Sequence, residues 1–66
     1  MDEIKRTLIE KAKEEYGHIR PIRGKLGQHM SLNDCFTLHD GKLLFWFNTS
    51  DDTTRMLIKE VVNGSN

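Results

Sequence analysis

The chain has 66 residues, 36% of them hydrophobic, and no net charge at pH 7, which fits one small domain over residues 1–66. A domain of this size buries only about 60% of the surface that its unfolded chain exposes, which leaves little room for a deep substrate cavity. The longest apolar run, residues 43–47, is far shorter than the ~18 residues of a membrane span. The single cysteine, Cys35, excludes an internal disulfide and a zinc site built from several cysteines.

The first segment is predicted to form an amphipathic helix from about Asp2 to Tyr16. The acidic residues Asp2 and Glu3 suit the positive end of the helix dipole, and Gly17 suits the left-handed residue that ends a helix. The apolar residues recur at helical spacing and form one stripe, which consists of Ile4, Leu8, Ile9, Ala12 and Tyr16.

Residues 18–32 are expected to contribute a short strand. The residue before Pro21 is pushed into an extended conformation, and Pro21 lacks an N–H, so a strand here belongs at a sheet edge or contains a bulge. Gly24 and Gly27 bracket a turn. Residues 28–32 form either a second short strand or an ordered loop.

A β-hairpin is predicted around Asp40 and Gly41, a dipeptide typical of type I′ turns. A two-residue loop fixes the register of residues 34–39 against residues 42–47, so that paired residue numbers sum to 81. One face then holds the predicted core and places Asp34 opposite Phe47; its apolar members are Phe36, Leu38, Leu43, Phe45 and Phe47. The other face pairs His39 with Lys42, Thr37 with Leu44, and Cys35 with Trp46.

A second helix is predicted from about Asp51 to Val62. Thr49 and Ser50 are N-cap candidates, Asp51 and Asp52 add negative charge to the first turn, and residues 63–64 provide a stop. The expected fold class is therefore α+β, a two-layer sandwich in the order α-β-β-β-α. Its two helices would cover one face of a two- or three-stranded antiparallel sheet, because an isolated hairpin is rarely stable.

Catalytic, metal and cofactor sites are not expected. Cys35 and His39 are four residues apart on a strand and thus roughly 13 Å apart, too far to share a metal or a hydrogen bond. Asp51 and Asp52 are interpreted as stabilising a helix terminus rather than as a catalytic carboxylate pair. No phosphate-binding glycine loop and no nucleophile elbow is present, so we expect no enzyme.

The only basic cluster lies in residues 17–33, which carry a net charge of +3. This cluster indicates binding of an anion, or of RNA or single-stranded nucleic acid, with Trp46 and Phe47 available to stack on bases. The basic excess is smaller than that of most nucleic-acid-binding domains, so this function is the alternative. Its predicted residues are Arg20, Arg23, Lys25 and His29.

The leading hypothesis concerns the sheet face that two helices on the other side would leave uncovered. Such an apolar patch with a tryptophan is typical of a protein interface, although the first helix or residues 24–32 can also fold over it. We therefore expect an interaction module that binds a protein partner or a second copy of itself, without a membrane. The acidic start of the chain predicts a cytoplasmic location. The predicted surface consists of Cys35, Thr37, Leu44 and Trp46.

Overall fold

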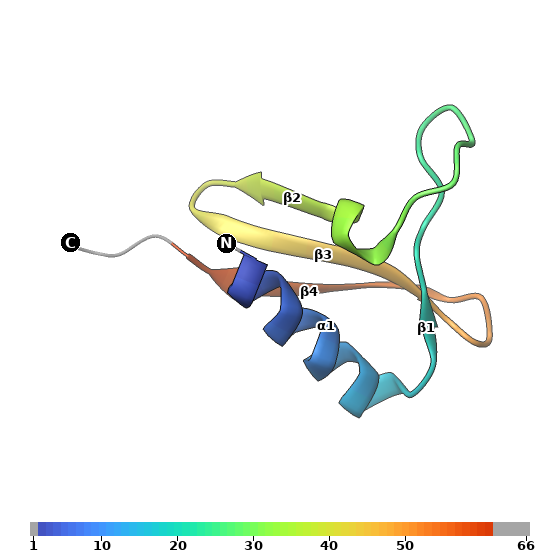
Figure 1. Ribbon diagram of the computed structural model, residues 1–66, viewed down its shortest axis with the longest axis horizontal. Coiled ribbons are helices and arrows are strands. Elements are labelled where there is room, and N and C mark those ends of the chain that lie inside the picture. The colour runs from blue at the N-terminus through green and yellow to red at the C-terminus, as the bar shows by residue number, and fades with distance from the viewer. Residues whose placement is uncertain (1, 62–66) are drawn as a thin grey trace.

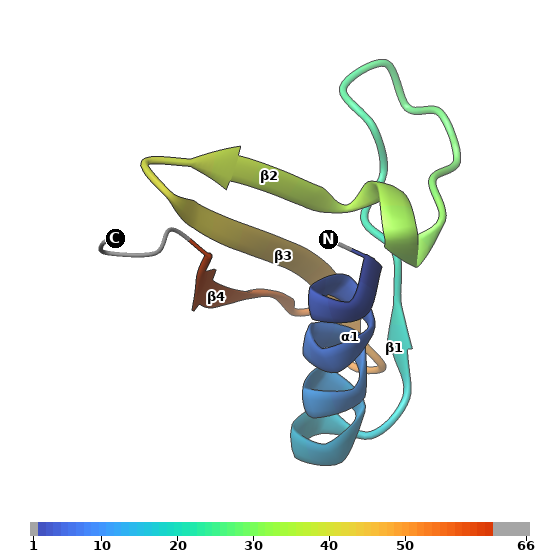
Figure 2. The ribbon, with the colours of Figure 1, turned by 60° about the vertical axis from the view of Figure 1, so that its left-hand side comes forward.

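The computed structural model describes residues 2–61, and within them the chain forms one helix and one antiparallel sheet of four strands. The α+β class is thus confirmed. Helix α1 lies against one face of the sheet, and the loop that follows β1 extends away from the body of the domain (Figures 1 and 2). The elements are α1 (Asp2–Tyr16), β1 (Ile19–Arg20), a 3-10 turn η1 (Leu32–Asp34), β2 (Phe36–His39), β3 (Lys42–Thr49) and β4 (Thr54–Glu60).

Strand β3 is the centre of the sheet. Strand β4 pairs with β3 along one edge, from Lys42 opposite Glu60 to Asn48 opposite Thr54. Strands β2 and β1 share the other edge, β2 along the first half of β3 and β1 at its end, where Ile19 lies opposite Thr49. Pairing on both edges holds β3 in place.

Helix α1 has the bounds that its apolar stripe predicted. Leu8 and Ala12 are buried against the sheet, with Ile4, Ile9 and Tyr16 packed at their sides. Gly17 adopts a φ of +76° and donates its N–H to the carbonyl of Lys13 at 2.9 Å. The glycine ends the helix in the left-handed conformation, as expected.

The hairpin between β2 and β3 has the predicted turn and register. Asp40 and Gly41 have φ values of +55° and +71°, as a type I′ turn requires, and Phe36 pairs with Phe45. The Phe36 and Phe45 rings stack with their centroids 4.5 Å apart. Alternate residues of β3 are buried beneath α1 and form the core: Leu43, Phe45, Phe47 and Thr49.

Two residues of the predicted core face do not contribute to the core. Leu38 is on the expected face but is 60% exposed, because β2 is an edge strand and only Phe36 reaches the core. Asp34 does not pair with Phe47. It ends η1, where its carboxylate accepts hydrogen bonds from the hydroxyl and backbone N–H of Ser31 at 3.0 and 3.4 Å.

The predicted second helix is wrong, because residues 54–60 form strand β4 instead. Residues 50–52 make a three-residue hairpin loop in which Asp52 has a φ of +66° and donates its N–H to the carbonyl of Thr49 at 2.9 Å. A helix here would leave the backbone groups on one edge of β3 without partners, whereas β4 satisfies them over seven residues. The order is therefore α-β-β-β-β, and the predicted stop at residues 63–64 lies outside the described residues.

The strand expected within residues 18–32 is β1, which has only two residues and lies at the sheet edge, as Pro21 requires. The turn between Gly24 and Gly27 is also present, closed by the N–H of Gly27 on the carbonyl of Gly24 at 2.9 Å. Residues 28–31 form a loop, which settles the alternative left open by the sequence.

Candidate interaction surface

The sheet face opposite α1 carries an exposed apolar surface. Leu44 pairs with Ile58 and Trp46 pairs with Met56 across β3 and β4. Trp46 is 36% exposed and Ile58 is 53% exposed, and the other two side chains are partly exposed. We call this surface the open face; it consists of Thr37, Leu44, Trp46, Met56 and Ile58.

Strand parity creates the open face. Side chains alternate between the two faces of a strand, and the buried Leu43, Phe45 and Phe47 all point toward α1. Leu44 and Trp46 must therefore point away from the helix. Since the described chain contains a single helix, no second helix covers this side (Figure 2).

The two ends of the open face differ in polarity. At one end Lys42 pairs with Glu60, which places opposite charges on neighbouring strands. At the other end Asn48 pairs with Thr54, whose hydroxyl donates a hydrogen bond to Asn48 Oδ1 at 2.6 Å. The apolar centre therefore lies between a pair of opposite charges at one end and, at the other end, an uncharged polar pair that is flanked by the Arg20–Asp52 ion pair.

Cys35, predicted to lie on this surface, is instead part of the core. Its φ and ψ of −94° and 36° are not those of a strand, so the alternation of β2 stops at Phe36 and the Cys35 side chain turns inward. The thiol lies 3.3 Å from the carbonyl of Ser31. Burial raises the pKa of the Cys35 thiol, which keeps it protonated and unreactive.

Met56 and Ile58 belong to the open face, although the sequence pattern assigned them to a helix. The run from Thr54 to Glu60 also fits a strand, because Met56, Leu57 and Ile58 form a short continuous apolar run, which periodicity alone does not assign to a helix. The turn-forming residues 50–52 directly after an apolar strand were the second available signal. Together they predict a hairpin as well as a helix start.

The predicted basic residues are divided between two cavities. Arg20, Arg23 and His29 line a cavity of about 260 Å³ next to Asn48. Lys25 lines an adjacent, more apolar cavity together with Arg23 and the 93% exposed Leu26. Arg20, Arg23 and His29 therefore share one cavity, whereas Lys25 lines only the neighbouring cavity, to which Arg23 also contributes.

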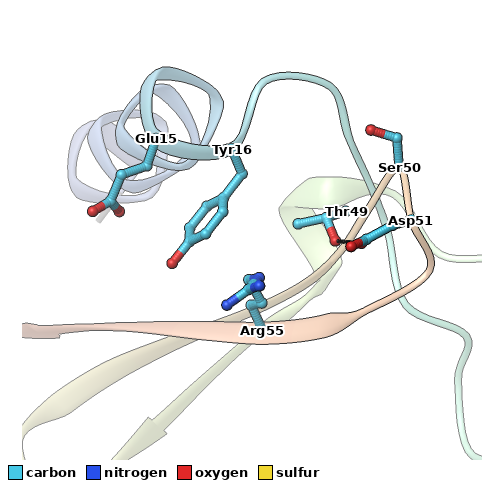
Figure 3. A pocket seen from close by; sticks show the side chains of 6 residues that line it. All are labelled: Glu15, Tyr16, Thr49, Ser50, Asp51 and Arg55. Carbon is cyan, nitrogen blue, oxygen red and sulfur yellow. Dashed lines mark hydrogen bonds between the residues drawn. The ribbon is translucent and has the colours of Figure 1, made fainter.

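A further cavity of about 370 Å³ lies between the end of α1 and the β3–β4 turn (Figure 3). Two of its three charged groups have partners within the protein. The Arg55 guanidinium lies 4.8 Å from the centre of the Tyr16 ring, and the Asp51 carboxylate accepts a hydrogen bond from the Thr49 hydroxyl. The Arg55–Tyr16 contact ties α1 to the sheet, so we interpret the cavity as structural.

Within residues 2–61, no three side chains of the His, Cys, Asp or Glu type come together as metal ligands. The one helix of this part of the chain is too short and too polar to cross a membrane. Comparison with known proteins yields no match to a family model, to a curated protein sequence or to a solved structure. The functional proposals therefore depend on the residues of this chain alone.

Proposed function

We propose that this protein is a small, cytoplasmic, non-catalytic module that self-associates by packing the open faces of two copies together. The observation that carries the proposal is the exposure of Trp46 and Ile58 on the sheet face opposite α1. Apolar side chains that cluster on a monomer surface mark an interaction site, and tryptophan is a frequent anchor of such sites. A partner surface would remove these side chains from water.

A second copy of the chain is the occupant that fits best, because the open face is complementary to itself. A two-fold axis that runs along the strands, midway between β3 and β4, places β3 of one copy over β4 of its partner. Trp46 then faces the partner's Met56, and Leu44 faces the partner's Ile58. Such an isologous contact uses each pair twice.

The charged rim supports the same arrangement. In this packing, Lys42 of each copy faces the partner's Glu60, so each charge at the rim meets an opposite charge. Like charges directly opposite one another would destabilise the contact. Sheets stacked in this way keep their strands within about 30° of each other and enclose a core about 10 Å thick. The short side chains of Asn48 and Thr54 close the other end, where the charge of Arg20 beside Asn48 is paired with Asp52.

Sedimentation equilibrium tests the proposal. The wild type should show twice the 7.7 kDa mass of the chain at high concentration, whereas Trp46→Lys and Ile58→Lys should remain monomeric. Leu26→Lys is the matched control, because Leu26 is an exposed apolar residue on a loop outside the open face. All three variants should keep the circular dichroism spectrum of the wild type.

Two results would overturn self-association. One is a wild type that stays monomeric at millimolar concentration. The other is a dimer that Trp46→Lys and Leu26→Lys weaken equally, because the contact would then not involve the open face.

A further inference from the structure

A second surface feature, away from the open face's apolar centre, is the cavity between β1, the following loop and the end of β3. Its walls contain two arginines, a histidine and an asparagine, and none of the residues that line it is acidic. Its volume is about 260 Å³, which accommodates a small anion. The lining residues are Arg20, Pro21, Ile22, Arg23, His29, Met30 and Asn48. We propose that this cavity binds the phosphate group of a small ligand.

The arginines have donors to spare. Arg20 uses Nη2 for the carbonyl of Thr49, at 3.1 Å, and for the carboxylate of Asp52. Arg23 uses Nη1 for the carbonyl of Gly27, at 3.1 Å. Within residues 2–61, the Nε atom and the other terminal nitrogen of each arginine donate to no protein group. Guanidinium groups that are held through one terminal nitrogen, with their other donors free, are suited to bind phosphate.

Asn48 and His29 also present donors. Asn48 Oδ1 accepts a hydrogen bond from the Thr54 hydroxyl, which leaves the amide NH₂ of Asn48 as a free donor. The imidazole of His29 carries an N–H in every protonation state. Because the cavity offers donors and positive charge but no acidic side chain, its complement is an oxyanion.

Asp52, which lies outside the cavity, competes with a bound phosphate for the Arg20 guanidinium. Its carboxylate forms an ion pair with Arg20 but does not line the cavity. A phosphate that recruits the Arg20 guanidinium must share it with this carboxylate. Removal of the Asp52 charge should therefore strengthen phosphate binding. Nonspecific attraction to surface arginines would instead respond equally to the removal of any nearby aspartate charge.

Chemical-shift titration with inorganic phosphate and with phenyl phosphate measures the affinity and separates the two sources of the phosphate group. Phenyl phosphate should bind more tightly if the apolar wall of Pro21, Ile22 and Met30 contacts the organic part of an ester. Equal affinities would assign the cavity to free phosphate. Both results support the site.

The variants come in matched pairs. Arg23→Gln should weaken phosphate binding about tenfold, whereas Lys25→Gln, with the same loss of charge nearby, should leave it unchanged. Asp52→Asn should tighten binding several-fold, whereas Asp40→Asn should not. Asp40 and Asp52 both occupy left-handed turn positions, with φ of +55° and +66°, which asparagine tolerates.

Three results would overturn the phosphate site. The first is the absence of saturation with either probe at millimolar concentration. The second is equal weakening by Arg23→Gln and Lys25→Gln, which indicates diffuse attraction. The third is a single-stranded oligonucleotide that binds far more tightly than phenyl phosphate with a steep salt dependence, which indicates a nucleic-acid surface. Trp46→Lys should retain phosphate binding, so this test is independent of self-association.

Discussion

Trp46 and Met56 lie side by side on the sheet face opposite α1, whereas their sequence neighbours Phe45 and Leu57 form the adjacent pair on the face beneath the helix. Phe45 is completely buried, while Trp46 is 36% exposed. One residue along the same strand therefore changes the role of a large aromatic side chain from core packing to surface contact. The effects of substitution should follow this alternation.

Phe45→Ala should lower the free energy of unfolding by about 3–5 kcal/mol, because it removes a fully buried ring and leaves a cavity. Leu38→Ala, on the same face of the neighbouring edge strand, should cost only about 0.5 kcal/mol, because Leu38 is 60% exposed. Urea denaturation followed by tryptophan fluorescence measures both values. Equal costs at the two positions would contradict the position of the core.

Gly41→Val should destabilise the protein by about 1–2 kcal/mol or more, because a β-branched residue resists the φ of +71° that the turn requires. Gly41→Asn is the matched variant, since asparagine enters the left-handed region more readily. The midpoint of thermal unfolding should fall clearly for valine and only slightly for asparagine. A valine variant as stable as the asparagine variant would argue against the type I′ turn.

Asp51 should contribute to the pH dependence of stability. Its carboxylate accepts hydrogen bonds from the side chain of Thr49 and from Thr53, and these lower its pKa below the ordinary value of 3.8. A pKa lower in the folded state than in the unfolded state means that the ionised carboxylate stabilises the fold above about pH 3.8. This contribution is lost as the pH falls through the folded-state pKa.

The variant Asp51→Asn isolates this charge. Its deficit in unfolding free energy relative to the wild type should be present at pH 7 and should shrink below pH 3.8, as measured by urea denaturation at a series of pH values. A deficit that stays constant down to pH 2 would show that the hydrogen bonds do not depend on the charge of Asp51.

Proline substitutions should distinguish the two edges of β4. Two backbone hydrogen bonds show which residues of β4 direct their N–H and C=O groups toward β3. They run from Thr49 N–H to the Thr53 carbonyl and from Val61 N–H to the Gly41 carbonyl. In an antiparallel ladder the direction of the backbone N–H groups alternates along the strand. Lys59 therefore donates its N–H to β3, whereas the N–H of Ile58 points to the edge of β4 that is away from β3.

Lys59→Pro should therefore destabilise the fold markedly more than Ile58→Pro, because only the former removes a bond of the ladder. Thermal unfolding of the two variants provides the comparison. The reverse order of stability would mean that residues 54–60 do not form β4 in this register.

Local signals in the sequence determined the elements whose geometry depends on neighbouring residues. The apolar stripe of α1 together with Gly17 predicted the helix and its end, and Asp40 with Gly41 predicted the hairpin and its register. These features depend on backbone preferences and side-chain periodicity within a few residues. Since the turn sets the register, the position of Trp46 opposite the core followed from sequence alone.

Tertiary structure decided the rest. Residues 54–60 carry a pattern that fits a helix or a strand, and the free edge of β3 selects the strand because its backbone groups need partners. The same choice places Met56 and Ile58 beside Trp46, which enlarges the open face. Cys35 is not part of that face, because η1 interrupts the alternation of side chains before Phe36. Side-chain periodicity in the sequence does not predict this bend. The cavity of Arg20, Arg23 and His29 likewise exists only because β1 pairs with the distant end of β3.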